Sequence, residues 1–556
     1  MINAVQALEV ILILGVTVLL AWLISPYITG VFKRKPSRLD KFFNPIENFI
    51  YKITGVNTEQ TMGWKQYFLA GLLINIVMMV VAFLILIFQG SLPLNPMGVP
   101  GLKPDLAFMQ VVSFTTNTDL QHYAGESVTN GFSYLSQIGV LQWLMFTSAI
   151  TGLCMGIAFI RGLVVGAKDM GNFYVDFTRA ITRIFIPLSV IVAIIFIALG
   201  VPQTLNGNIA IKTIEGVPQT LLVGPVASLD SIMQLGTNGG GYYGANAAYP
   251  YMNPSPISNI LLIGLMLFLP TALIFVFGQM IGKKSESRPL LWGAYILYGM
   301  NLIIAFIPAL PLVAPDLETR FGGFMSSFYT VTTTVATTGS LNSALVGNHP
   351  LTILSGFLGM FIQSIPGGKG VGMMYMVMFI VITVFIVGLM SGRTPEYLNM
   401  KITGRDVKLV MIAFLIHPII ILVPTVLAYV TGAVNAIPGF SGGSVGYTQI
   451  LYEFTSAAAN NGSDFLGAQA NTPFFNIATA IVMLVGRYAP IAILLALSGS
   501  MIGRKRGGTT SGLRTDTFIF TLVLIAAILI LVVLTFFPFL AVGPLEEFFK
   551  GMVNGL

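Results

Sequence analysis

Four short runs of threonine, asparagine and glycine interrupt an otherwise apolar chain of 556 residues. Their centres lie near positions 117, 238, 339 and 461, so they recur at a period of roughly 100–120 residues. Glycine and small polar residues let the backbone turn so that its carbonyl oxygens face a shared axis. Rings of such oxygens replace the hydration shell of a potassium-sized ion. The residue types therefore predict cation coordination rather than acid–base or nucleophilic chemistry.

A short amphipathic stretch leads into each run, within the segments 105–121, 228–246, 320–343 and 447–465. A helix of 10–12 residues is roughly 15–18 Å long, about half the thickness of the hydrocarbon core of a membrane. The partial negative charge at its C-terminus favours a cation. Non-helical backbone after it is tolerated at membrane depth only where protein buries it or where it lines water. The alternative is four ordinary Asn/Gly turns, which the repetition in register disfavours.

The composition places these segments in a membrane protein, because 55% of the residues are hydrophobic and only 9% are charged. Soluble proteins carry about 25% charged residues. Ten windows are apolar and long enough to cross a membrane. The first window has no basic leader and no clear cleavage site, so we expect a retained helix rather than a signal peptide. The windows are 4–25, 67–89, 133–160, 183–201, 257–281, 289–313, 372–391, 409–432, 475–501 and 517–541.

The order of these elements predicts an all-α polytopic membrane protein with four pseudo-symmetric units around a central pore. Each unit would contain a span, a half-length helix, a polar run and a second span, over residues 66–163, 180–282, 289–392 and 409–503. One extra transmembrane helix is expected at each end, at 1–30 and 515–541. A secondary transporter with inverted repeats would need paired halves of opposite topology, whereas these units all begin on the same side.

The basic residues are sorted between the two sides of the membrane. Twenty of the 28 Lys and Arg residues lie in loops that follow odd-numbered spans, at 33–41, 161–183, 283–288, 393–408 and 504–514. The positive-inside rule places these loops in the cytoplasm and both termini outside. Nucleic acid is disfavoured as a partner, because no aromatic-rich soluble module accompanies the charge.

The segment 360–376 interrupts what would be the second span of the third unit. Pro366 removes a helical hydrogen bond, and Gly368 and Gly370 loosen the backbone, so we expect a broken stretch at 364–372. A break below a filter suits an intramembrane gate. Lys369 lies in its middle, and a buried ammonium is costly and is usually functional or paired. We expect Lys369 to block or regulate the exit; the alternative is structural pairing with a carbonyl or carboxylate.

Several motifs resemble the potassium-binding A subunit of the Kdp-type potassium-transporting ATPases: PLNP at 93–96, VSFTTNT at 112–118, GPVAS and GTNGGGYYGAN within 224–246, GRTPEYL at 392–398 and SAAANNGS at 456–463. The resemblance covers essentially the whole chain. It implies a channel-like subunit that works with a P-type ATPase B subunit, a C subunit and a small F subunit, and that passes potassium to the B subunit. The related Trk/Ktr proteins share the fourfold plan but lack both extra helices, so a stand-alone channel or symporter is the alternative.

The resemblance also implies site residues. Gln121 falls on a position associated with ion affinity. Arg487 matches an arginine of the family and would repel potassium from a straight exit and divert it to the pump; a structural ion pair is the alternative. The implied potassium-filter positions are Thr116, Asn117, Thr118, Thr237, Asn238, Gly239, Thr338, Gly339, Asn460, Asn461 and Gly462.

The chain departs from the family pattern at three places. Asp119 stands where a neutral asparagine is expected, and its carboxylate would either concentrate cations at the outer mouth or lie behind the filter, hydrogen-bonded to backbone. The third run, ATTGSL, is rich in threonine where the family often has a cysteine. Lys369 stands where an acidic residue is expected.

Nucleotide chemistry is not expected in this chain. It contains neither a GxxxxGK[ST] motif nor the DKTGT sequence of P-type ATPases. The GxGxxG match at 239–244 neither follows a strand nor precedes a helix, so it is not a dinucleotide site. His122, His349 and His417 are isolated and lack metal-ligand spacing. We therefore expect a non-hydrolytic subunit, with potassium as its transported ion, in the cell membrane of a prokaryote.

Overall fold

The structure is a computed structural model, and it describes residues 4–307, 320–504 and 514–553. Ten of its helices are long and apolar enough to cross a membrane in the described part of the chain, as the sequence predicts. The last six residues of the sixth predicted window, 308–313, and two of the basic residues, Lys505 and Arg506, lie outside the described residues. The predicted fold class, an all-α polytopic membrane protein, is confirmed.

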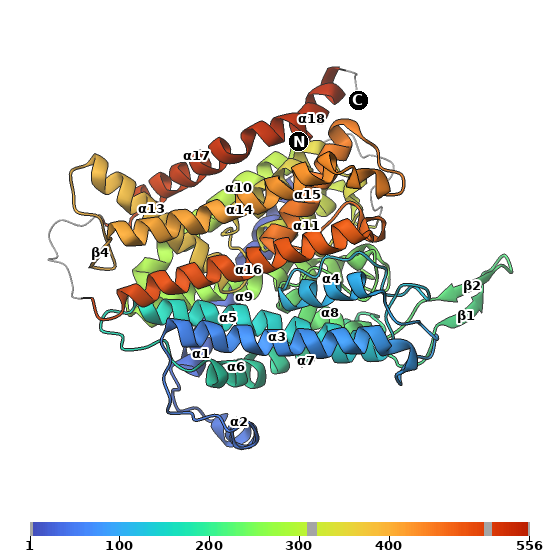
Figure 1. Ribbon diagram of the computed structural model, residues 1–556, viewed down its shortest axis with the longest axis horizontal. Helices are drawn as coiled ribbons and strands as arrows, with labels where there is room; N and C mark the ends of the chain where they lie inside the picture. The colour runs from blue at the N-terminus through green and yellow to red at the C-terminus, as the bar shows by residue number, and fades with distance from the viewer. Residues whose placement is uncertain (1–3, 308–319, 505–513, 554–556) are drawn as a thin grey trace.

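The same order of helices occurs four times along the chain. A long helix is followed by a shorter one, then by a polar run, then by a second long helix (Figure 1). The short helices are α4 (Pro104–Thr115), α8 (Val226–Leu235), α11 (Gly322–Val335) and α15 (Gly443–Ala459). The preceding spans are α3 (Trp64–Phe88), α6 to α7 (Phe173–Ala198), α10 (Ser287–Phe306) and α14 (Gly404–Val430). The following spans are η2 with α5 (Ser136–Leu163), α9 (Pro256–Ile281), α12 with α13 (Pro350–Ile362 and Val371–Met390) and α16 (Pro473–Met501).

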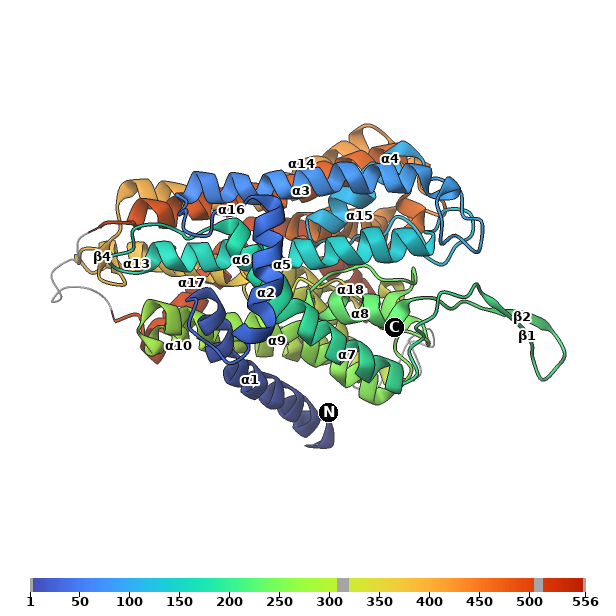
Figure 2. The same ribbon diagram turned by 90° about the horizontal axis from the view of Figure 1, so that it is seen from below.

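The four short helices gather in one half of the molecule. This is the half from which the hairpin of β1 (Ile209–Lys212) and β2 (Pro218–Leu221) projects (Figure 1), and Figure 2 shows the same for α4, α8 and α15. The second small sheet, β3 (Glu396–Tyr397) and β4 (Met400–Lys401), lies at the opposite end. The spans run between these two ends, so the polar runs that follow the short helices are carried into the interior.

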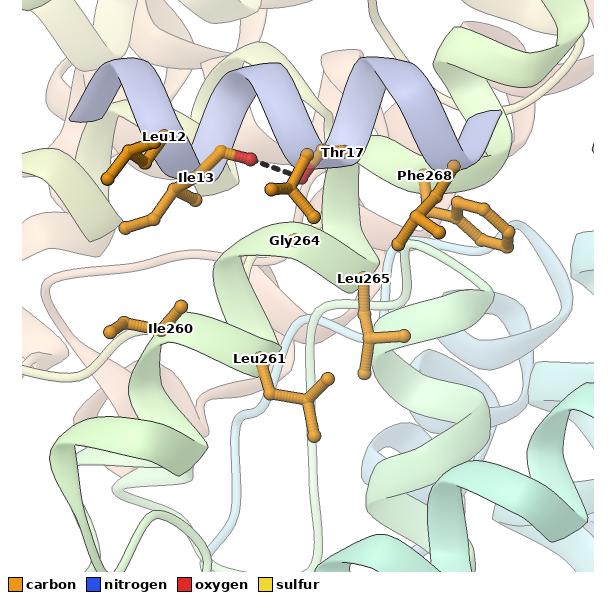
Figure 3. A pocket seen from close by; sticks show the side chains of 10 residues that line it. Leu12, Ile13, Thr17, Ile260, Leu261, Gly264, Leu265 and Phe268 are labelled. Atoms are coloured by element: carbon orange, nitrogen blue, oxygen red, sulfur yellow. Dashed lines mark hydrogen bonds between the residues drawn. The ribbon is translucent and has the colours of Figure 1, made fainter. Parts of the chain in front are cut away.

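The outer helices lie against the repeated body. Helix α1 (Ala4–Phe32) packs along α9, whereas α17 (Phe518–Val542) contacts α10, α12 and α13. A hollow of about 400 Å³ with an almost entirely apolar lining separates part of α1 from α9 (Figure 3). Only 17% of the most apolar window of α1 is buried, against 94% for Ser136–Leu163. The body is therefore centred on α5, whereas the described chain leaves most of α1 uncovered.

Several elements were not expected from the sequence. Helix α2 (Asp40–Thr54) and helix α18 (Pro544–Val553) are too short and too polar to register as spans. The β1–β2 hairpin turns at Gly216, whose φ of 79° favours glycine. Its short exposed strands carry little hydrophobic periodicity, which is the signal from which strands are predicted.

Candidate functional site

The four short helices end in the same turn. The backbone N–H of Thr118, Asn238, Thr338 and Asn461 donates to the carbonyl oxygen five residues earlier, at 3.0, 2.8, 2.8 and 2.9 Å. The residue before each of these has a positive φ: 65° at Asn117, 44° at Thr237, 48° at Thr337 and 51° at Asn460. Because non-glycine residues adopt this conformation only occasionally, its fourfold recurrence places the segments in one register.

The four segments meet at a common point. A Cβ added to Gly239 would overlap the carbonyl oxygens of Thr118 and Asn461, and it would lie 2.7 Å from the Cα of Gly462. A Cβ added to Gly339 would lie 2.7 Å from the Cα of Gly239. Each unit therefore brings backbone to within contact of the others, and a side chain at these glycines would fill the space between them.

Asparagine side chains tie the segments together. Asn117 Nδ2 donates to the carbonyl oxygen of Thr237 at 2.6 Å, and Asn461 Nδ2 donates to that of Thr333 at 2.9 Å. Asn460 Nδ2 donates to Thr118 Oγ1, also at 2.9 Å. All these side chains are buried. The bonds fix the position of one backbone segment relative to the next, which is the pre-organisation that carbonyl coordination of an ion requires.

The observed register differs in two places from the residues singled out by sequence. Thr116 caps α4 and corresponds to Gly236, one step before the turn. Thr337 shares the positive-φ position with Asn117 and Thr237, although only Thr338 and Gly339 were expected in the third unit. Counting from the end of the preceding helix, rather than from the run of letters, would have found Thr337.

Asp119 occupies the slot that glycine fills in the other three units, Gly239, Gly339 and Gly462. Its φ is 53°, its side chain is fully buried, and neither carboxylate oxygen has a hydrogen-bond partner among the described residues. The alternative in which backbone donors satisfy this carboxylate is therefore not what the structure shows. A buried carboxylate without a partner is costly unless a cation or a proton compensates it.

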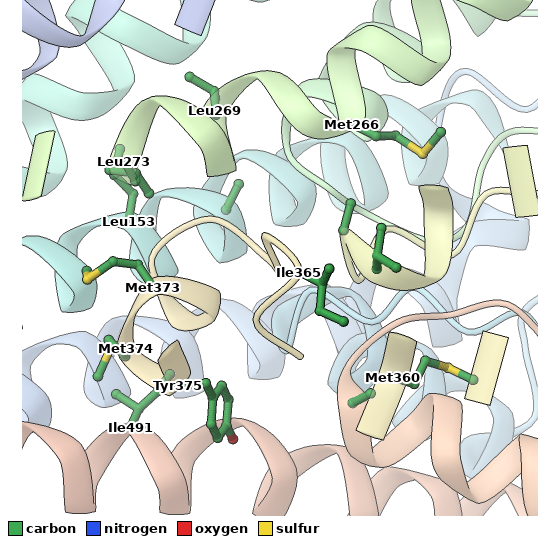
Figure 4. Packing of buried hydrophobic residues seen from close by; sticks show 14 of the residues in the cluster. Leu153, Met266, Leu269, Leu273, Met360, Ile365, Met373, Met374, Tyr375 and Ile491 are labelled. Atoms are coloured by element: carbon green, nitrogen blue, oxygen red, sulfur yellow. The ribbon is translucent and has the colours of Figure 1, made fainter. Parts of the chain in front are cut away.

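The broken stretch between α12 and α13 lies inside the body. Leu153 of α5, Leu273 of α9 and Ile491 of α16 pack around the beginning of α13 (Figure 4). A Cβ added to Gly156 of α5 would lie 2.7 Å from the Cα of Gly370. The small residues of α5 thus leave room for the non-helical backbone at 363–370.

Lys369 reaches from this stretch to the base of the four segments. Its Nζ donates to the carbonyl oxygen of Gly236, to Thr237 Oγ1 at 2.8 Å and to Asn117 Oδ1 at 3.1 Å. The side chain is only 3% exposed. Its partners are oxygens of the first and second units, so the ammonium takes the kind of ligands that a bound cation would take.

Arg487 of α16 lies on the same side of the four segments. Its Nη2 donates to the carbonyl oxygen of Ser148 at 3.0 Å, and in the described part of the chain it forms no ion pair with a carboxylate. Arg487 and Lys369 both line a small cavity of about 10 Å³ beneath Asn117, Thr237 and Asn460. Two cationic side chains therefore face the space directly below the segments.

Comparison with known proteins decides the family. The sequence pattern described as "Potassium-transporting ATPase A subunit" matches residues 11–549. The chain belongs to the potassium-transporting ATPase A subunit family. It is 42% identical over 560 aligned residues to the "Potassium-transporting ATPase potassium-binding subunit" of Caldanaerobacter subterraneus subsp. tengcongensis, covering 97% of this chain and 99% of that protein. The crystal structure of the potassium transporter TrkH from Vibrio parahaemolyticus aligns with a TM-score of 0.49 at 15% identity, over 88% of this chain and 98% of that one.

In this member of the family, Gln121 braces the second segment. Its Nε2 donates to the carbonyl oxygen of Gly241 at 3.1 Å, and its Oε1 accepts from the Gly241 N–H at 3.3 Å. Both bonds cross between units at the level just beyond the turns. Gln121 therefore holds backbone in place and does not point freely into solvent.

A buried polar cluster next to Gln121 was missed by sequence reasoning. His122 Nε2 lies 2.9 Å from Glu453 Oε1, and its Nδ1 lies 2.7 Å from Asn476 Oδ1. Asn476 Nδ2 donates to Asp105 Oδ2 at 2.8 Å and to Asn471 Oδ1, which fixes the orientation of the Asn476 amide. Both ring nitrogens of His122 thus lie within hydrogen-bond distance of side-chain oxygens, which ties the ring to α15 and α16. His122 and Glu453 are 331 residues apart, and no local signal in the sequence pairs them.

Proposed function

We propose that this chain binds and translocates potassium as the channel-like subunit of an ATP-driven potassium uptake complex. One observation carries this proposal: four backbone segments in the same register meet at glycines that leave no room for a side chain. Membership of the potassium-transporting ATPase A subunit family and a relative named as a potassium-binding subunit support it. Carbonyl oxygens at such a point would replace the hydration shell of the ion.

The proposed filter takes one segment from each of four units, 66–163, 180–282, 289–392 and 409–503, which surround a central pore. Asp119 and Gln121 would act at the outer side, Asp119 as a charge that raises cation occupancy and Gln121 as a brace. The filter residues are Thr116, Asn117, Thr118, Thr237, Asn238, Gly239, Thr338, Gly339, Asn460, Asn461 and Gly462, to which the observed register adds Thr337.

Below the filter, Lys369 would close the direct path, with Gly368 and Gly370 allowing the stretch around it to move. Lys369 donates to oxygens that an ion leaving the filter would need. Arg487 adds a second positive charge beside the same cavity. Together they would oppose a straight exit and favour passage to a pump subunit.

The chain would not hydrolyse ATP itself and would bind no nucleotide. Its partners would be a P-type ATPase B subunit, a C subunit and a small F subunit, in the cell membrane of a prokaryote. The basic loops would face the cytoplasm, and both termini would be extracytoplasmic.

The test is potassium-stimulated ATPase activity of the complex, purified with candidate pump subunits, for the native chain and for Gly239→Ala. The added methyl group would enter the space between segments, so we expect Gly239→Ala to need at least roughly tenfold more potassium, equivalent to about 1.4 kcal/mol. Gly299→Ala is the matched control, because a Cβ there meets nothing within 4 Å. If no pump subunit co-purifies and the chain alone conducts potassium in liposomes, the stand-alone channel takes the place of this proposal.

A further inference from the structure

Helix α2 (Asp40–Thr54) lies crosswise to the spans. It is seen end-on in Figure 1, where α3 and α5 run across the picture, and it crosses them in Figure 2. One face docks on the chain through the buried side chains of Phe43, Glu47 and Tyr51. Arg183 Nε and Nη2 donate to the Glu47 carboxylate at 2.6 and 2.8 Å, so the orientation of the helix is fixed.

Arg183 also anchors the first turn of α2. Its Nη1 donates to Asp40 Oδ1 at 2.5 Å, and its Nη2 donates to Asn44 Oδ1 at 2.7 Å. Hydrogen bonding to Arg183 lowers the pKa of the Asp40 carboxyl, so this contact persists at neutral pH. The rotation of α2 about its axis, and therefore which side chains face away, follows from these bonds.

A second face of α2 is apolar and uncovered by the described chain. Phe42, Ile46, Phe49 and Ile53 are 68%, 43%, 65% and 67% exposed. Their spacing of four, three and four residues puts them on one stripe of the helix. Lys41, Asn48 and Lys52 are exposed on a third face, and within the described ranges neither lysine has an ion-pair partner.

The neighbouring chain connects this stripe to lipid. Helix α1 ends at Phe32, and only seven residues, 33–39, separate it from α2. Most of α1 is exposed, and the helix is long and apolar enough to cross a bilayer. The connecting residues include Lys33, Arg34, Lys35 and Arg38, all exposed. An amphipathic helix that lies across the spans, beside the end of one of them and next to clustered basic residues, has the form of an interfacial helix.

We propose that α2 lies in the membrane interface, with Phe42, Ile46, Phe49 and Ile53 inserted among lipid acyl chains and with Lys41 and Lys52 at anionic headgroups. Burial of the apolar stripe would set how deeply the helix inserts, and the lysines would be attracted to a negatively charged leaflet. The surface is thus a lipid-binding surface distinct from the ion path.

Spin labels on neighbouring residues of α2 test this in the intact complex, reconstituted in vesicles of phosphatidylcholine and phosphatidylglycerol. The single cysteine, Cys154, is buried and is replaced by alanine. A label at Phe49→Cys should collide severalfold more often with oxygen than with a water-soluble nickel chelate, and a label at Asn48→Cys should show the reverse. The pair Ile53→Cys and Lys52→Cys repeats the comparison should one variant assemble poorly.

Three results would overturn the proposal. Labels at 49 and 53 that prefer the nickel chelate would put the stripe in water. Labels shielded from both reagents would show that a partner subunit covers it. An oxygen preference that is unchanged in vesicles of phosphatidylcholine alone, where it should fall severalfold, would remove the role of the lysines.

Discussion

At the scale of single residues, three charged side chains are buried near the four polar runs. Asp119, Lys369 and Arg487 all lie buried at or beside the four converging segments. Their neighbours are backbone carbonyls, amides and hydroxyls, and Asp119 has no hydrogen-bond partner among the described residues. Burying a charge costs free energy, so buried charges are usually functional or compensated. In the proposed cation path, these three would set which ions enter and where the ions leave.

Replacing Lys369 by methionine keeps most of the side-chain volume and removes the ammonium. Gly236 and Asn117 would each lose a donor, at a cost of about 1–3 kcal/mol per group, and the space beneath the filter would open to potassium. We expect a lower thermal midpoint and a severalfold faster passive potassium flux in liposomes without ATP. Lys65→Met, at an exposed lysine, is the control. A destabilised variant with an unchanged flux would mean that Lys369 is structural only.

His122→Ala should raise the potassium concentration for half-maximal ATPase activity by roughly tenfold, with little change in maximal rate. It leaves the buried Glu453 without its hydrogen-bond partner, which typically costs about 1–3 kcal/mol, and it frees Gln121 next to it. Adding Glu453→Gln replaces the unpartnered carboxyl by an amide, so the double variant should recover part of the affinity. Equal defects in the single and double variants would show that the two side chains do not act together.

At the scale of elements, two irregularities would build the proposed ion path. Each short helix stops in a positive-φ turn and presents its C-terminal carbonyls to the centre. The second span of the third unit divides into α12 and α13, which lets Lys369 reach the converging segments. The broken stretch depends on the close approach of two backbone segments. Gly152 and Gly156 of α5, one helical turn apart, lie against it.

Gly156→Ala should disturb that approach. Its methyl group would lie 2.7 Å from the Cα of Gly370, and overpacking of this kind costs about 1–3 kcal/mol. We expect a lower thermal midpoint together with weaker potassium stimulation, measured on the same preparation. Gly15→Ala in α1 is the comparison, because nothing lies within 4 Å of a Cβ there. A native-like thermal midpoint and potassium stimulation for Gly156→Ala would show that the broken stretch between α12 and α13 moves aside freely.

At the scale of the whole molecule, charge and shape are polarised along the spans. The β1–β2 hairpin projects from the half that holds the short helices, and the basic loop that follows α13 lies at the opposite end (Figure 1). The filter would therefore open towards the side opposite the basic loops, as expected for a protein that collects potassium outside the cell.

Cysteine labelling of intact cells can check this orientation in a Cys154→Ala background. Lys212 in the hairpin and Arg393 after α13 are both exposed. A membrane-impermeant maleimide should modify Lys212→Cys in intact cells, and it should modify Arg393→Cys only after permeabilisation. The reverse pattern would place the filter mouth in the cytoplasm and would contradict uptake.

Local patterns in the sequence determined much of this protein. Runs of apolar residues set the ten spans, because a membrane demands about 20 such residues for each helix. Half-length helices followed by Thr, Asn and Gly set the position of the polar runs, and Pro366 with its neighbouring glycines marked the break between α12 and α13. These features depend on residues close together in the chain, so that periodicity and composition reveal them.

Only the tertiary structure decided which of these residues meet. Lys369 contacts Gly236 across 133 residues, and His122 contacts Glu453 across 331. The register that puts Asp119 in a glycine slot and adds Thr337 to the proposed filter emerges from hydrogen bonds at the helix ends. Such contacts follow from how helices pack around a centre, and side-chain periodicity along one helix carries no information about its distant partners.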